Sequence, residues 1–81
     1  MNVERIQFKG QLAEAKSKYK NLDTEAAGLI ILLRSLLNPF EEDTTKIDIE
    51  KITVQTARLQ NIIFELRSLK DKIDNLEAYF G

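Results

Sequence analysis

The stretch "NPFEEDTTKID", Asn38 to Asp48, interrupts a chain that is otherwise patterned for helix. Pro39 disfavours helical backbone at the preceding residue and has no backbone N–H to donate, so a first helix should end near Leu37. Elsewhere the chain has no proline and only three glycines, and nearly a third of its residues are charged, as is typical of an all-helical composition.

A second helix is predicted to begin at the end of this stretch. Asp48 is a good N-cap, and Ile47 and Ile52 have the spacing of a hydrophobic staple across it. Thr44 or Thr45 is an alternative cap. The predicted elements are a helix over about residues 3–37, a turn over about 38–47 and a helix over about 48–80.

Apolar residues recur in alternating steps of three and four along both predicted helices, which is the heptad pattern of a coiled coil. In the first helix the pattern comprises Phe8, Leu12, Ala15, Tyr19, Leu22, Ala26, Leu29, Leu33 and Leu36. In the second it comprises Ile52, Gln55, Leu59, Ile62, Leu66, Leu69, Ile73, Leu76 and Phe80, of which only Gln55 is polar. We call these two sets the seam.

The two halves of the seam match if the chain folds back on itself. Antiparallel partners must have residue numbers with a constant sum, and the seam pairs sum to 84 or 85, as Leu33 with Ile52 does. The same register pairs Leu36 with Ile49. The midpoint falls at Glu42, inside the predicted turn. The fold predicted is therefore all-α, an antiparallel two-helix hairpin that resembles a coiled coil.

Charged residues beside the seam support this register, because opposite charges meet there. The expected pairs are Glu25 with Arg58, Lys18 with Glu65, and Lys9 with Glu77, whereas Lys16 faces Lys70. Exposed pairs of this kind select a register more than they stabilise it.

The chain has 81 residues and neither cysteine nor histidine. We expect residues 1–81 to form one domain, and a core of this size rarely supplies more than about 3–5 kcal/mol without reinforcement. Zinc sites, disulfides, thiol nucleophiles and histidine-dependent catalysis are excluded by composition. Oligomerisation is therefore the expected reinforcement, and no catalytic, cofactor-binding or metal-ligating residue is predicted.

Charge and hydropathy give expectations about partners and location. The net charge is −1 with neither sign concentrated in one half, so no nucleic-acid partner is expected. No stretch approaches the ~20 apolar residues that span a bilayer, and "MNVERIQFKGQL" lacks the apolar core of a signal peptide. The sequence predicts a cytoplasmic, non-enzymatic protein without a small-molecule substrate.

Several large apolar residues lie outside the seam and collect on one side of the predicted hairpin, mostly in the half nearest the turn. Large apolar residues outside the seam include Ile30, Ile31, Leu32, Leu37, Val54, Ile63 and Phe64. We call the predicted interface the apolar flank; it comprises Ile30, Ile31, Leu37, Ile63 and Phe64 together with Ala27 and Thr56. The opposite side is mainly charged. Apolar residues grouped in this way predict a protein–protein interface. Pairing of two hairpins through the apolar flank would make a four-helix bundle.

Two other uses of the apolar flank are compatible with the sequence. It would also suit an adaptor or inhibitor that binds a different protein. Peripheral membrane association is the other alternative, although the flank lacks the tryptophan and flanking basic residues expected of interfacial helices.

The charged clusters, the polar seam residue and the internal glycine are each explained by their place on a helix, without a binding site. Asp71, Asp74 and Glu77 are expected to form a solvated helix face, and "KSKYK", residues 16–20, is more typical of such a face than of a nucleic-acid contact. Gln55 either fixes the register or reaches solvent. Gly28 is predicted to permit close contact between the helices.

The segment "GLIILLRSLLNPFEEDTTKIDIEKITVQTARLQNIIFELRSLKDKIDNLE" resembles small uncharacterised proteins of Mu-like prophages. Those proteins also show a helix, an "R-x-LLNP" turn, here Arg34 to Pro39, an acidic stretch and a second helix with a leucine-rich end. The resemblance implies a phage accessory origin and carries no known activity.

Overall fold

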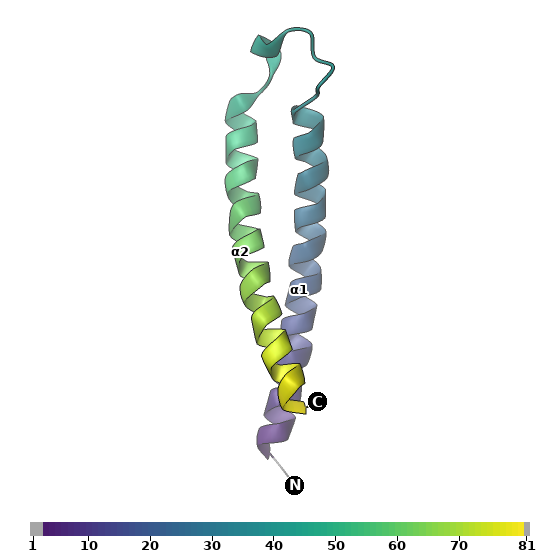
Figure 1. The fold of residues 1–81 in the computed structure, drawn as a ribbon, viewed down its shortest axis with the longest axis vertical. Helices are drawn as coiled ribbons and strands as arrows, with labels where there is room; N and C mark the ends of the chain where they lie inside the picture. Colours follow the sequence, from purple (N-terminus) through teal and green to yellow (C-terminus); the bar gives the residue numbers. More distant parts are fainter. Residues whose placement is uncertain (1–2, 81) are drawn as a thin grey trace.

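A computed structural model describes residues 3–80, so Met1, Asn2 and Gly81 of the predicted domain lie outside the described part of the chain. Two long helices, α1 (Val3–Leu36) and α2 (Ile49–Phe80), run antiparallel and contact each other along their length. Both described ends of the chain lie at the end of the molecule opposite the turn (Figure 1). The predicted all-α antiparallel hairpin is confirmed for residues 3–80.

The helix ends lie within one residue of their expected positions. α1 ends at Leu36, one residue before the predicted end, and the last α-helical hydrogen bond is donated by Leu37 N to Leu33 O over 2.9 Å. α2 begins at Ile49, because Asp48 is its N-cap: Lys51 N donates to Asp48 Oδ1 over 3.0 Å.

A short 3₁₀ helix, η1 (Thr44–Lys46), lies within the connection and has its own cap. Asp43 Oδ1 accepts hydrogen bonds from the Thr45 backbone N–H (3.1 Å) and from the Thr45 hydroxyl (2.6 Å). These bonds, the hydroxyl's first, lower the pKa of the exposed Asp43 carboxyl below its ordinary value. The alternative in which Thr44 or Thr45 caps the long second helix is wrong, since both residues belong to η1.

The seam forms the contact between the two helices. Every seam side chain whose exposure is described is buried or half-buried; the Phe80 side chain lies outside the described residues. The buried ones are Ala15, Ala26, Leu33, Ile52, Ile62 and Leu76. The face of each helix that packs against the other helix is therefore the one that the heptad pattern of apolar residues predicts.

One residue expected to pair across the seam is largely exposed. Ile49, expected opposite Leu36, is 56% exposed. The backbone is extended at Ile47 and Asp48 caps the helix, so Ile49 is the first helical residue of α2. The first buried seam residue of α2 is Ile52. The half-buried isoleucine at this end of the hairpin is Ile47, immediately before the cap.

Ion pairs across the hairpin confirm two of the three charge pairs expected. Arg58 donates hydrogen bonds to Glu25, and Lys18 Nζ lies 2.9 Å from Glu65 Oε1. The hydrogen bond and the charge of Glu65 raise the pKa of Lys18 above its ordinary value.

The third ion pair differs from the expected one. Glu77 pairs with Lys16, at 2.8 Å, and not with Lys9. Lys16 faces Lys70 in this register, and Glu77 lies seven residues, about two helical turns, farther along α2. Reaching toward Glu77 therefore takes the Lys16 ammonium group away from a like charge.

Gly28 takes no part in the contact between the helices. Ala26 is buried in the seam, whereas Gly28 is exposed and a Cβ added to it would meet no atom within 4 Å. The prediction that Gly28 permits close helix contact is therefore wrong, because Gly28 lies on the outer side of α1.

The hairpin is a thin rod. Its principal extents are 66 × 18 × 15 Å and its radius of gyration is 18.4 Å, whereas a compact domain of this length has a radius of gyration of about 12 Å. A rod of two helices encloses few side chains, and among the described residues no large side chain is less than 2% exposed. The seam is a single line of contact and not a core surrounded on all sides.

Candidate interaction surface

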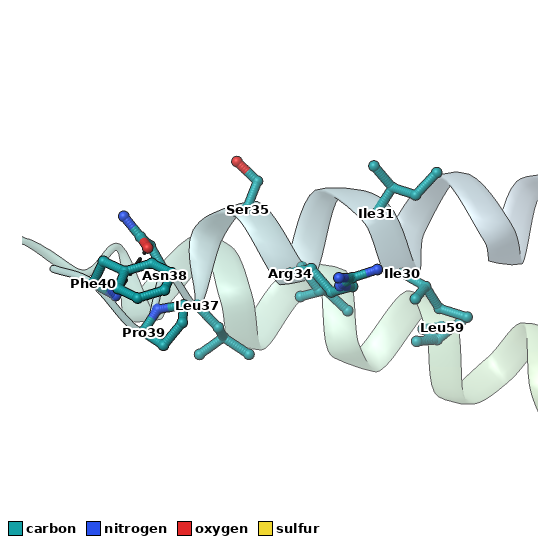
Figure 2. A pocket seen from close by; sticks show the side chains of 10 residues that line it. Ile30, Ile31, Arg34, Ser35, Leu37, Asn38, Pro39, Phe40 and Leu59 are labelled. Carbon is teal, nitrogen blue, oxygen red and sulfur yellow. Dashed lines mark hydrogen bonds between the residues drawn. The ribbon is translucent and has the colours of Figure 1, made fainter.

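An apolar groove runs along the turn-proximal half of the hairpin on the side of the apolar flank (Figure 2). Ile30 and Leu37 of α1 line it, together with Phe40 of the turn and Leu59 of α2. In Figure 2 the Ile30 side chain lies beside that of Leu59, so both helices contribute to the floor. Arg34 is the charged residue among those that line it.

A second groove continues the first on α2. Thr56, Ile63, Phe64 and Arg67 line it, and Leu59 belongs to both grooves. The Arg67 guanidinium carbon lies 5.9 Å from the centroid of the Phe64 ring, within reach of a cation–π interaction. The two grooves therefore form one apolar surface that crosses from α1 to α2.

The structure places the residues of the predicted interface on this surface as follows. Six of the seven line one of the two grooves: Ile30, Ile31, Leu37, Thr56, Ile63 and Phe64. Ala27 is exposed on α1 but is not among the lining residues. Ile63 is half-buried within the hairpin, and the other six are exposed. In Figure 2 the Ile31 side chain points away from Ile30, so it lies at the edge of the surface.

Phe40 is the residue of this surface that the heptad pattern missed. Its side chain is 86% exposed, the largest value among the exposed large apolar residues. It lies in the turn, where no heptad position is defined, so helical periodicity assigns it to neither face. The sequence feature that could have identified Phe40 is its position as an aromatic residue between Pro39 and an acidic stretch.

The other side of the hairpin is mainly polar. It carries the Arg58–Glu25 and Lys18–Glu65 ion pairs, and Leu32 among them is half-buried. Val54 is an exposed apolar residue that lines neither groove. Charge on one side and apolar groove on the other give the hairpin two chemically different sides.

The remaining candidates from the sequence lie in ordinary positions. Asp71 and Asp74 are exposed, and no cluster of three or more acidic side chains within residues 3–80 is arranged to hold a metal ion. Within "KSKYK", Tyr19 is half-buried in the seam and two lysines form ion pairs. Gln55 is half-buried, and no buried side-chain nitrogen or oxygen of the described residues lacks a hydrogen-bond partner.

Between residues 3 and 80, neither helix has an apolar run of the length needed to cross a bilayer. Comparison of the chain with models of protein families, with curated proteins and with solved structures finds no match. The apolar surface is thus the feature of the molecule that bears on its function.

Proposed function

We propose that this chain is a non-enzymatic structural or protein–protein interaction module that self-associates through the apolar flank, extended by Phe40, into a four-helix bundle. The observation that carries the proposal is the apolar surface formed by the two joined grooves. Isolated apolar residues on a surface are common, but a contiguous groove lined from two helices and a turn is typical of an interaction site.

The hairpin exposes more surface than a compact protein of its mass, which is consistent with a partner that covers part of it. The accessible surface is 6414 Å², whereas a compact monomer of 9.3 kDa exposes about 5000 Å². The difference, roughly 1400 Å², exceeds the ~800 Å² that each partner buries in a standard protein–protein interface. Burial of roughly that area on each copy would bring the exposed area per chain down to that of a compact monomer of this mass.

A second copy also supplies what the single hairpin lacks. Two helices bury one line of side chains, whereas four helices surround a core on all sides. Ile30 and Leu37 of α1 and Ile63 of α2 would then become core residues of the bundle. The resemblance of the turn to small proteins of Mu-like prophages suggests a phage accessory role for such a module.

The test compares two charged variants by light scattering and circular dichroism. Ile30→Lys combined with Ile63→Lys should halve the molar mass and lower the helicity, because the charges lie in the groove and the isolated hairpin is marginal. Val54→Lys introduces a charge on the other side of the hairpin and should keep the wild-type mass.

Other results would support other functions. A wild-type chain that is monomeric at tens of micromolar, with unchanged helicity, would favour an adaptor that binds a different protein. Co-sedimentation of the wild-type chain with anionic vesicles, lost in the double lysine variant, would favour membrane association.

A further inference from the structure

We propose that the two copies pack antiparallel, with a two-fold axis near Ile30, so that Phe40 of each copy docks in the groove around Phe64 of the other. This inference rests on the self-association proposed above and specifies its geometry. The occupant of the groove is thus a second copy of this chain, and the group that docks is an aromatic ring on its turn.

Phe40 is held in position for such a contact. The Asn38 side chain accepts a hydrogen bond from Phe40 N over 3.0 Å, and the intervening Pro39 restricts the backbone (Figure 2). Glu41 N also donates to Asn38 O over 3.3 Å. A large exposed aromatic side chain on a backbone fixed in this way loses little conformational entropy on binding, which is typical of anchor residues at interfaces.

The position of the axis follows from the register of the hairpin. Seam pairs sum to 84 or 85, so Phe64 lies beside residue 20 or 21 of α1. Phe40 lies about 20 residues farther toward the turn, or about 30 Å at the rise of an α-helix. The midpoint between Phe40 and Phe64 is therefore near Ile30. A two-fold axis there exchanges the two positions and places Ile30 against its own copy, as a self-complementary interface requires.

The same axis brings opposite charges together. Arg67 lies beside residue 17 or 18 of α1, about 12 residues from Ile30 on the side of the chain termini. Glu42 lies the same number of residues from Ile30 on the side of the turn. Each Arg67, already beside the ring of Phe64, would face the acidic turn of the other copy. One axis thus matches both the aromatic and the charged groups.

A parallel pair would match neither. With the two-fold axis along the rod, each residue meets residues of the other copy at its own height. Phe40 would then remain about 30 Å from Phe64 of the other copy. The two acidic turns, each with Glu41, Glu42 and Asp43, would lie side by side, and like charges in contact disfavour a pairing.

The chain has no cysteine, so a single introduced one can carry a spin label for a distance measurement within the dimer. Ala13→Cys suits this purpose, because Ala13 is exposed and lies 17 residues from Ile30, outside the overlap of the two copies. The antiparallel dimer predicts about 50 Å between the two labels. A distance below about 30 Å, the width of a bundle of helices spaced 8–10 Å apart, would overturn this inference and leave self-association intact.

A second measurement tests the docking of Phe40 itself. Phe40→Ala should weaken the dimer by about tenfold or more, as expected for an aromatic anchor, while the helicity stays unchanged at concentrations where the variant is still dimeric. Val54→Ala, which removes an apolar side chain from the other side, is the matched control and should leave the dimer affinity unchanged. Equal affinities for Phe40→Ala and wild type would overturn the docking, and a monomeric wild-type chain would overturn the self-association on which it rests.

Discussion

Arg58 Nε lies 3.0 Å from Glu25 Oε1, although 33 residues separate them in the chain. The pair bridges α2 and α1 on the charged side of the hairpin, next to seam residues Ala26 and Leu59. A shift of one helix by one turn would place Arg58 beside a different α1 residue and move the whole seam. The ion pair therefore marks the antiparallel register on which the geometry of the apolar surface depends.

Glu25→Gln is expected to lower the free energy of unfolding by about 0.2–1 kcal/mol, because both partners are partly exposed and screened by water. The effect should shrink as salt is added. Chemical denaturation at low and high ionic strength measures it, with Asp71→Asn, at an exposed position, as the control. A loss that does not change with salt would argue against an electrostatic contribution.

Ile62→Ala should unfold much of the protein. Ile62 is 2% exposed, and removing a buried isoleucine side chain to alanine costs about 2–5 kcal/mol. A single small core supplies only about that much in total. Ile62→Val removes one methylene and should cost about 0.5–1.5 kcal/mol, leaving a folded helix pair. Thermal unfolding followed by circular dichroism separates the two variants, and a wild-type melting temperature for Ile62→Ala would be inconsistent with the seam.

Asp48→Ala should destabilise the start of α2 by about 1 kcal/mol, because it removes the acceptor for Lys51 N. Asp48→Ser keeps an oxygen at the cap and should recover most of the loss. Chemical denaturation of the three proteins is the measurement. If the serine and alanine variants were equally destabilised, the hydrogen bond to the cap would not be the source of the effect.

Gly10→Ala should stabilise the protein by about 0.5–1 kcal/mol. Gly10 lies inside α1, where glycine is unfavourable for backbone entropy, and a Cβ there meets no atom within 4 Å. The melting temperature should therefore rise. A fall would mean that the outer face of α1 is covered by something at Gly10.

The helices, their antiparallel pairing and the covered face of each could be predicted from the sequence because each depends on a repeated signal. Steps of three and four over four heptads define a face, and Pro39 and Asp48 limit where the helices end. The constant sum of the seam pairs then fixed the register. Two ion pairs agreed with it in the structure.

Features that depend on one local interaction, and not on a repeated pattern, could not be predicted from the sequence. Ile49 lies one residue after an N-cap, where apolar spacing alone cannot say whether the seam has begun. Lys16 pairs with Glu77, although the register places Lys16 opposite Lys70. Long charged side chains can reach several neighbouring positions, so the register alone does not determine which ion pair forms. Phe40 belongs to a turn without periodicity, so only its hydrogen-bonded backbone reveals how its ring is presented.

In the proposed dimer the apolar flank is covered by a second copy of the chain. Sedimentation equilibrium of the wild-type protein, from low to high micromolar concentration, tests it most directly. We expect a mass that rises with concentration to twice the 9.3 kDa of one chain. A mass that stays at 9.3 kDa across the range, for a chain that is fully helical, would contradict it.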